Sequence, residues 1–216
     1  MNIILFGPPG AGKGTQAQFI VKKHNYFQLS TGNLLRDEVK LKTSLGSKIE
    51  QLISNGEFVS DEVVNTLLKQ AITHLKFRDR IIFDGYPRNL SQAENLNKLL
   101  SEYNQKINIV IKLKVSLDTV KKRITGRLTC SKCSKIFNEF FSPPPANMIC
   151  CQDGTLQKRD DDNVAVAVKR FETYEKSTEP VLKFYEKLNL VKDLNGETNI
   201  ESIQSKISDY LTVIEA

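Results

Sequence analysis

GPPGAGKGT, at residues 7–15, joins a short apolar run of β type (residues 2–6) to a helical pattern (residues 15–23). Glycines let a backbone curl until successive N–H groups point at one anion, and the helix that follows adds the positive end of its dipole. A Gly-rich turn needs no cation for its own folding, so the lysine at position 13 indicates an anionic ligand. The stretch predicts a loop that cradles phosphates, with Lys13 extending to the β- and γ-phosphates of a nucleotide.

One position departs from the usual pattern of such loops. They carry Ser or Thr directly after the lysine, where the hydroxyl binds Mg²⁺, whereas here Gly14 takes that place and Thr15 follows one residue later. We therefore expect the metal ion to depend on water and carboxylates, with Asp84 as the candidate for a direct or water-mediated contact. The departure argues against a GTPase, and the chain has no Asn-Lys-x-Asp sequence to read guanine.

Length and composition indicate an ordinary globular protein. The chain has 216 residues, of which 40% are hydrophobic and 26% charged, so it has room for a core and is not a disordered or low-complexity chain. No apolar run approaches the roughly 20 residues of a membrane helix. The first ten residues lack the basic start of a secretory signal and turn to Gly and Pro after six residues. We expect a cytoplasmic protein without a membrane partner.

The net charge is +6, from 31 basic and 25 acidic residues. A nucleic-acid partner is one interpretation. However, the lysines are spread along the whole chain and form no tail or stripe, and a pocket for anionic nucleotides also favours a basic balance. We therefore expect nucleotides as ligands and no nucleic acid.

Strand and helix patterns alternate along the chain. After the first strand, β-type runs stand at residues 80–83, 107–115 and 190–194, and helical patterns at residues 90–103, 117–124 and 200–214. This alternation predicts an open parallel α/β sheet, which binds its ligands at the carboxyl ends of the strands. Residues 164–168 alternate like a strand, but Asp162 and Asn163 before them are capping residues and favour a helix.

Two segments break the rhythm and are predicted to be insertions on the sheet core. Residues 31–59 are helical in pattern, with no strand between the helices. Residues 129–157 are irregular, carry three consecutive prolines and hold all four cysteines. We expect Phe137, Phe140 and Phe141 to pack inside this second insertion.

A second phosphate site is predicted at Asp84-Gly85-Tyr86-Pro87-Arg88, followed by Gln92. Gly85 lets a ligand approach the main chain, Arg88 offers a planar fork for a phosphate, and Gln92 can pair with the edge of a base. The alternative is a plain turn with a solvated arginine. Upstream, Thr31 is interpreted as a helix cap, and Arg36 as either a solvated charge or a phosphate ligand.

Four further arginines flank the cysteine-bearing insertion. Arg123 and Arg127 are four residues apart and share a helix face if that helix continues, while Arg159 and Arg170 are eleven apart. Surface charge is the alternative for each of them. Asp161 and Asp162, beside Arg159, either anchor the insertion or cap the helix that follows.

The cysteines have the spacing of a metal site. Cys130-x-x-Cys133 and Cys150-x-x-Asp153 form two pairs separated by sixteen residues. Three cysteines and one aspartate make an acceptable set for structural Zn²⁺, and a cytosolic setting disfavours a disulfide. Cys151 could replace Cys150 or Asp153 after a small shift of register, and an insertion without metal is the other alternative.

Four segments together resemble the adenylate kinase family: GPPGAGKGTQ, STGNLLR, FDGYPRNLSQ and RDDD stand in the family's order and spacing. The resemblance covers essentially the whole chain and is closest to the long bacterial type with a zinc-bearing lid. It implies an α/β fold with a parallel-sheet core (residues 1–29, 60–121 and 160–216), a nucleoside monophosphate (NMP)-binding domain (30–59) and a lid (122–159). It also implies a monomer that converts ATP and AMP to two ADP with Mg²⁺.

The resemblance further implies roles for individual residues. The ATP ligands would be Gly10, Ala11, Gly12, Lys13, Gly14, Thr15, Arg123 and Arg127. The AMP ligands would be Thr31, Arg36, Val59, Val64, Gly85, Arg88, Gln92, Arg159 and Arg170. The transferred phosphoryl group would be surrounded by Lys13, Arg88, Arg123, Arg159 and Arg170. Arg123 would also stack on the ATP base, and Thr31 with Gln92 would select adenine.

The acceptor in such a reaction is already an anion near neutral pH, so we expect no general base. Positioning and charge neutralisation would supply catalysis. Two alternatives remain at this point. One is a kinase of another nucleoside monophosphate, with UMP or CMP as acceptor or GTP as donor; the other is a nucleotide-binding zinc-ribbon protein without catalysis.

Overall fold

The computed structural model describes residues 1–55, 57–74, 79–133 and 135–215. A five-stranded parallel sheet has the order β2-β3-β1-β4-β8. Its strands are β1 (Asn2–Phe6), β2 (Phe27–Ser30), β3 (Ile81–Asp84), β4 (Ile107–Lys114) and β8 (Val191–Asn195). The predicted α/β class with a parallel sheet is confirmed, as are the four predicted strands, whereas β2 was not predicted.

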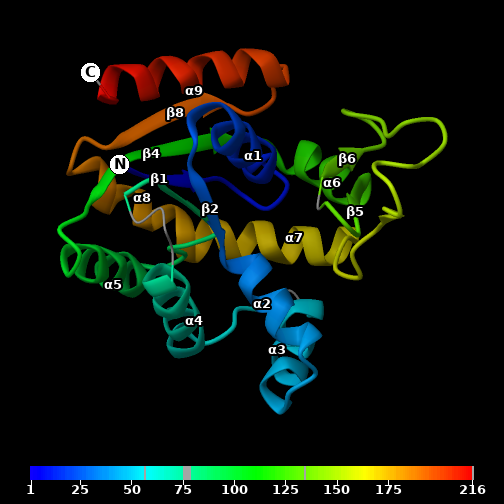
Figure 1. Cartoon of the computed structure of the whole chain (residues 1–216), viewed down its shortest axis with the longest axis horizontal. Helices are drawn as coiled ribbons and strands as arrows, with labels where there is room; N and C mark the ends of the chain where they lie inside the picture. Colours follow the sequence, from blue (N-terminus) through cyan, green and yellow to red (C-terminus); the bar gives the residue numbers. More distant parts are fainter. Residues whose placement is uncertain (56, 75–78, 134, 216) are drawn as a thin grey trace.

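Helices cover both faces of the sheet (Figure 1). They are α1 (Lys13–His24), α4 (Asp61–His74), α5 (Leu90–Ser101), α6 (Leu117–Thr125), α7 (Val164–Thr173), α8 (Glu179–Glu186) and α9 (Ile200–Glu215), with a π-helical turn at Tyr174–Thr178. β1 shows why two layers form, because successive side chains of a strand point to opposite faces. Ile3 and Leu5 pack with α1 and α9, whereas Ile4 and Phe6 pack with α5 and α8.

Two further parts project from this core (Figure 1). Helices α2 (Thr31–Lys40) and α3 (Ser44–Ser54) follow β2 directly, as the helical pattern predicted. Strands β5 (Arg127–Cys130), β6 (Ile136–Asn138) and β7 (Leu156–Gln157) form a small antiparallel sheet of order β6-β5-β7. The boundaries of an NMP-binding domain and a lid around these parts stay a prediction.

Three local expectations can be compared with the structure. Residues 164–173 are helical, and the Asn163 side chain caps them by accepting from the Val166 N–H at 2.9 Å. Phe137 is buried, but Phe140 and Phe141 are largely exposed, so the expectation that all three pack inside the insertion was wrong for two of them. Within the described ranges, no helix combines the length and apolarity needed to span a membrane.

Candidate active site

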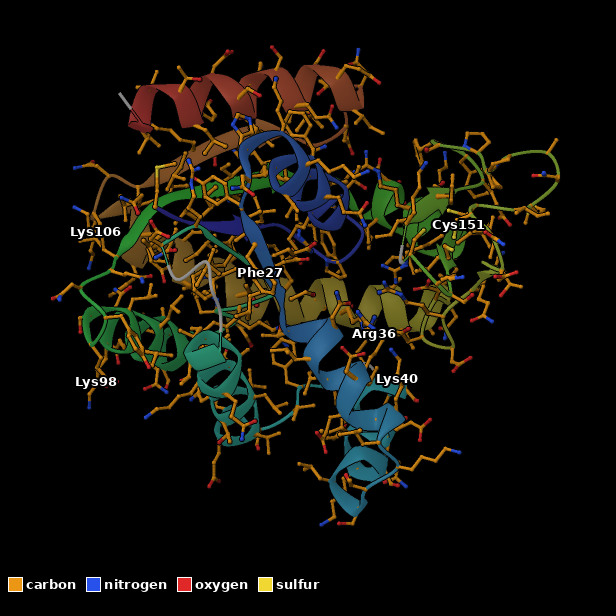
Figure 2. All side chains as sticks on the ribbon, in the orientation of Figure 1. Phe27, Arg36, Lys40, Lys98, Lys106 and Cys151 are labelled. Carbon is orange, nitrogen blue, oxygen red and sulfur yellow. The ribbon has the colours of Figure 1, made fainter. Side chains whose placement is uncertain are left out.

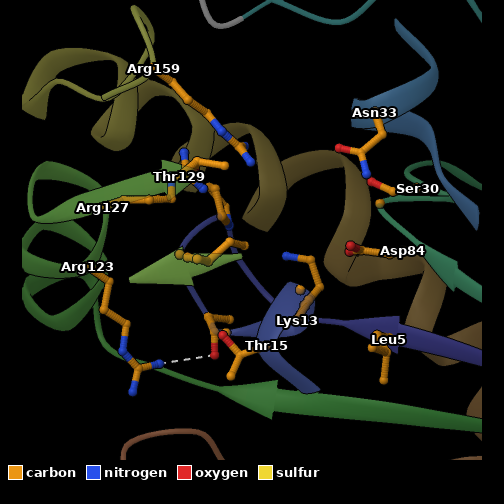
Figure 3. Close-up of a pocket in the computed structure, with 18 of the residues that line it drawn as sticks. Leu5, Lys13, Thr15, Ser30, Asn33, Asp84, Arg123, Arg127, Thr129 and Arg159 are labelled. Atoms are coloured by element: carbon orange, nitrogen blue, oxygen red, sulfur yellow. Dashed lines mark hydrogen bonds between the residues drawn. The ribbon is translucent and has the colours of Figure 1, made fainter. Parts of the chain in front are cut away.

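A cleft of about 740 Å³ opens at the carboxyl ends of the strands, between the core and its two projecting parts. The loop after β1, the loop after β3, helix α2 and the small sheet all contribute to its walls. Figure 3 shows Lys13 and Arg159 reaching into this space from different elements. The position agrees with the rule that open parallel sheets bind ligands beyond their strand ends.

The loop between β1 and α1 has the backbone shape that phosphate binding requires. Gly7, Gly10 and Gly12 have φ values of 145°, 78° and 97°, which residues with a Cβ atom rarely adopt. A Cβ on Gly7 would lie only 2.8 Å from the Leu113 carbonyl oxygen. The glycines are therefore needed for the curl of the loop and for its packing against β4.

Lys13 is folded back on this loop. Its ammonium donates to the carbonyl oxygens of Gly7 at 2.7 Å and Pro8 at 2.9 Å. Phosphate oxygens of a bound ligand can accept these hydrogen bonds in place of the carbonyls. Burial lowers the pKa of Lys13 to about 8, although the nearby Asp84 carboxylate opposes the shift. An anion bound here would restore the charged form.

Asp84 ends β3 beside Lys13, and the two side chains approach one another in Figure 3. Gln28 on β2 donates to its carboxylate at 2.9 Å and thereby fixes its orientation. The second carboxylate oxygen can still accept from water around a metal ion.

Arg88, in the loop after β3, is held at three points. Its Nε donates to the Gly85 carbonyl at 2.8 Å, its backbone N–H donates to Gln92 Oε1 at 2.7 Å, and its carbonyl accepts from the Thr178 hydroxyl at 2.9 Å. Its guanidinium lies 5.1 Å from the ring centroid of Phe58. Burial, assisted by the charge of Arg170, lowers the pKa of Arg88 to about 10. The site thus holds an incompletely compensated cation, which favours an anionic ligand.

A small cavity adjoins Arg88, and six of the predicted AMP ligands line it. They are Thr31, Val59, Val64, Gly85, Arg88 and Gln92. The structure corrects the interpretation of Thr31 as a helix cap. The N-cap of α2 is Ser30, and the Thr31 hydroxyl instead donates to the Gly85 carbonyl at 2.9 Å, because α2 starts against the loop after β3.

The arginines from the rest of the chain converge on the cleft, but they differ in their partners. Arg170 pairs with Asp161 at 2.6 Å and donates to the Ile53 carbonyl at 3.3 Å. Arg127 forms a two-point ion pair with Asp162. Both aspartates therefore anchor arginines, and the helix cap falls to Asn163.

Arg159 differs from these paired arginines. Among the residues that the structure describes, its guanidinium makes no hydrogen bond and no ion pair. Burial, followed by the charges of Arg127 and Arg36, lowers the pKa of Arg159 to about 9. Burial also lowers the pKa of Arg36, whose guanidinium donates to Asn33 at 2.6 Å. The unsatisfied donors of Arg159 are free to bind an anion in the cleft.

Arg123 and Arg127 do not share a helix face. Helix α6 ends at Thr125, and Arg127 begins strand β5, so the condition for a shared face fails. Arg123 donates to the carbonyls of Ala11 at 3.0 Å and Gly196 at 2.7 Å. Its guanidinium lies 5.3 Å from the ring centroid of Phe141. The guanidinium thus presents a flat cationic group beside the glycine loop.

The four cysteines form one cluster at the small projecting sheet, with Cys130 at the end of β5 and the others in the loops. The sulfur atoms of Cys130, Cys133, Cys150 and Cys151 all lie within 4.8 Å of one another. Cys130 and Cys151 are 3.7 Å apart, and Cys133 and Cys150 are 3.4 Å apart. Backbone N–H groups of Cys133 and Lys132 hold the pKa of Cys130 below its usual range, which favours its thiolate.

The structure brings Cys151, and not Asp153, together with the other three cysteines, so it does not assemble the predicted set of three cysteines and Asp153. Asp153 has a left-handed φ of 60°, and its side chain is 74% exposed, with a carboxylate oxygen 3.2 Å from Lys132. Gly154 supports this turn, since a Cβ there would lie 2.7 Å from the sulfurs of both Cys130 and Cys151. Figure 2 labels Cys151 within this part of the molecule.

Comparison with known proteins identifies the family to which the chain belongs. The sequence model of the family described as adenylate kinase matches residues 5–190. The chain belongs to the adenylate kinase family. An adenylate kinase of Pelagibacter ubique (strain HTCC1062) is 60% identical over 213 residues, covering 99% of this chain and 100% of that protein. An adenylate kinase of Archaeoglobus fulgidus is 39% identical, covering all of both chains, and one of Listeria monocytogenes is 37% identical, covering 98% and 99%.

For this member of the adenylate kinase family, sequence reasoning missed several residues around the site. Asp61 accepts from the side chains of Gln92 and Asn89, Phe58 lies by Arg88, and Thr178 binds the Arg88 carbonyl. Asp61 follows Ser60 at a helix start, so its pattern indicates only a helix N-terminus. The partners of these residues are distant in sequence, and no local pattern signals them.

Proposed function

We propose that the protein transfers the terminal phosphoryl group of ATP to AMP, reversibly, giving two ADP and maintaining the balance of adenine nucleotides. The observation that carries the proposal is a pair of buried cations, Lys13 on the glycine loop and Arg88 after β3, that line one cleft. The family supports adenine nucleotides as the ligands.

The reaction forms a bond between a phosphate oxygen of AMP and the γ-phosphorus of ATP. The bond from that phosphorus to the β,γ-bridging oxygen breaks, and its electron pair leaves with ADP. Because the attacking oxygen is already ionised, no side chain must remove a proton. The protein's task is to align the two phosphates and neutralise the charge spread over the transferred group.

The ligands divide between the two sides of the cleft. On the donor side, the loop from Gly10 to Thr15 binds the ATP phosphates, with Arg123 against the base and Arg127 nearby. On the acceptor side, the AMP ligands are Thr31, Arg36, Val59, Val64, Gly85, Arg88, Gln92, Arg159 and Arg170.

Catalysis falls to Lys13, Arg88, Arg123, Arg159 and Arg170. Among these, Arg159 has the largest unused donor capacity, and it contacts the transferred group without first breaking an ion pair. Arg170 instead keeps Asp161 as a partner. Arginines suit this role because they stay charged and bind two oxygens at once. Closing the cysteine-bearing part over the cleft excludes water, the competing acceptor.

Mg²⁺ accompanies ATP in this proposal and neutralises charge on the β- and γ-phosphates. Asp84 would hold its water shell, consistent with a carboxylate that Gln28 orients and that lies beside Lys13. The hydroxyl that usually follows the lysine is absent at Gly14, so Asp84 would contribute more to holding the metal than it does where that hydroxyl is present.

Structural Zn²⁺ fits the cysteine cluster. A tetrahedral Zn²⁺ with Zn–S bonds of about 2.3 Å would need its sulfurs about 3.8 Å apart; here Cys130 and Cys151 are 3.7 Å apart, Cys133 and Cys150 are 3.4 Å apart, and all four sulfurs lie within 4.8 Å of one another. Cys133 and Cys150 would supply the other two thiolates. The metal would hold together a part of the chain with only short strands and little core of its own.

We further propose that the protein is a cytoplasmic monomer that binds neither membranes nor nucleic acid. The spread of lysines along the sequence supports the absence of a nucleic-acid partner, since they form no tail or stripe. Gel filtration with light scattering measures the oligomeric state, and a salt-dependent RNA-binding assay measures nucleic-acid binding.

The function is tested by ³¹P NMR of the purified protein with Mg²⁺, ATP and, in turn, AMP, GMP, CMP or UMP. Rapid formation of ADP with AMP alone is the expected result. Turnover with CMP or UMP instead would keep the chemistry but overturn the assignment of Thr31 and Gln92 to adenine. Nucleotide binding without transfer to any acceptor would overturn the proposal and favour a non-catalytic nucleotide-binding protein.

A further inference from the structure

The side-chain amide of Gln92 is held at both ends. Its Oε1 accepts from the backbone N–H of Arg88 at 2.7 Å, and its Nε2 donates to the Asp61 carboxylate at 2.6 Å. Gln92 is only 4% exposed and lines the small cavity beside Arg88. These two short hydrogen bonds leave the amide no freedom to turn.

The two partners also determine which end of the amide is which. A backbone N–H can only donate, and an ionised carboxylate can only accept. A rotation of the amide by half a turn would set Nε2 against the Arg88 N–H and Oε1 against the Asp61 carboxylate. Both hydrogen bonds would then be replaced by repulsive contacts, so one orientation is enforced.

Asp61 is itself fixed. Its two oxygens accept from Asn89 Nδ2 at 3.1 and 2.9 Å, and Asn89 Oδ1 caps α5 by accepting from the Gln92 N–H at 2.8 Å. Asp61 begins α4, which packs against α5, and the two helices are neighbours in Figure 1. The orientation of the amide is therefore set by the packing of two helices and not by a flexible contact.

The oriented amide has one free hydrogen on Nε2 and one free lone pair on Oε1. Adenine offers the complement at adjacent positions, with a donor at its exocyclic amine and an acceptor at ring nitrogen N1. Hypoxanthine has nearly the same shape but offers an acceptor and a donor at those positions. An amide locked in one orientation can pair with only one of the two bases.

We propose that Asp61 is a positioning residue that sets the base specificity of the acceptor site by locking the Gln92 amide toward adenine. The inference rests on the proposed function, in which the acceptor base meets Gln92. Asp61 touches no substrate, and it acts by preventing the rotation that hypoxanthine would require.

The test compares AMP with inosine monophosphate (IMP), whose base is hypoxanthine, as acceptors for wild type, Asp61→Asn and the control Glu62→Gln. Glu62 is the exposed neighbour of Asp61 on α4, so the control removes the same charge without touching Gln92. An asparagine at position 61 can donate as well as accept, so it tolerates the rotated amide. We expect the ratio of kcat/KM for AMP over IMP to fall at least about tenfold in Asp61→Asn and to stay unchanged in Glu62→Gln.

The ratio serves as its own control, because a general loss of stability lowers both rates and leaves the ratio unchanged. An unchanged ratio in folded Asp61→Asn would overturn the inference. If that variant fails to fold, wild-type protein saturated with ¹⁵N-labelled AMP supplies the second measurement. A scalar coupling across the hydrogen bond between Gln92 Nε2 and N1 of the base is expected, and its absence would overturn the orientation. Failure of wild type to phosphorylate AMP would instead defeat the proposed function itself.

Discussion

Replacing Cys151 or Asp153 by serine distinguishes two possible metal sites. The cysteine cluster of the structure predicts that Cys151→Ser loses Zn²⁺ and that Asp153→Ser keeps it. The sequence pattern with three cysteines and Asp153 predicts the opposite. The two positions are only two residues apart, so general damage to the turn affects both variants alike.

The expected magnitudes differ widely. Structural Zn²⁺ sites bind with about 10–16 kcal/mol, so one ligand of four accounts for roughly 2.5–4 kcal/mol, or about 100- to 1000-fold in zinc affinity. Asp153 contacts Lys132 at 3.2 Å, and both side chains are more than half exposed. An exposed ion pair of this kind contributes under about 1 kcal/mol, so its loss leaves zinc affinity nearly unchanged.

The assay measures zinc per chain by mass spectrometry and zinc release during titration with a chelator, followed by thermal unfolding. Wild type and Asp153→Ser should hold close to one zinc per chain and release it at the same chelator concentration. Cys151→Ser should release it at a far lower concentration and unfold at a lower temperature. Retention of zinc by Cys151→Ser together with its loss from Asp153→Ser would refute the four-cysteine site, and freshly purified wild type without zinc would refute both sites.

Three further predictions concern Lys13 and Arg88. Lys13→Met should lower turnover at least about 100-fold with the fold intact, and near-normal turnover would contradict its role. The pKa of Lys13 is about 8 in the folded protein and 10.5 in the unfolded chain, so folding disfavours the charged ammonium. As the pH rises from 8 toward 10.5, the unfolding free energy of wild type should therefore increase relative to that of Lys13→Met. Measurements of Tm against pH for the two proteins test this. Thr178→Val should raise the KM for AMP roughly fivefold through loss of one hydrogen bond to Arg88 and should leave the KM for ATP unchanged. The matched control is Thr173→Val, which loses only a hydrogen bond to the Lys169 carbonyl within its own helix. Equal changes in both KM values would assign Thr178 a purely structural role.

Local chemistry made much of the architecture predictable. The glycines and Lys13 between a strand and a helix indicate a phosphate loop because few other uses exist for that combination. The alternation of apolar runs and helical patterns predicted the parallel sheet, since a buried strand leaves a continuous apolar run, as residues 3–6 do in β1. The β2 strand was missed because Phe27–Ser30 is a short edge strand with polar residues, and only its pairing with β3 makes it a strand.

The amino-acid sequence by itself determined which chemistry is available: the phosphate loop, the arginines and the thiols. Only the tertiary structure decided how those groups are used. It placed Cys151 among the sulfurs and turned Asp153 outward, it paired Arg170 with Asp161 but left Arg159 unpaired among the described residues, and it locked Gln92 against Asp61. The reason is physical, because periodicity and spacing report which face of a segment is buried, whereas hydrogen bonds between residues far apart in sequence form only when packing brings their elements together.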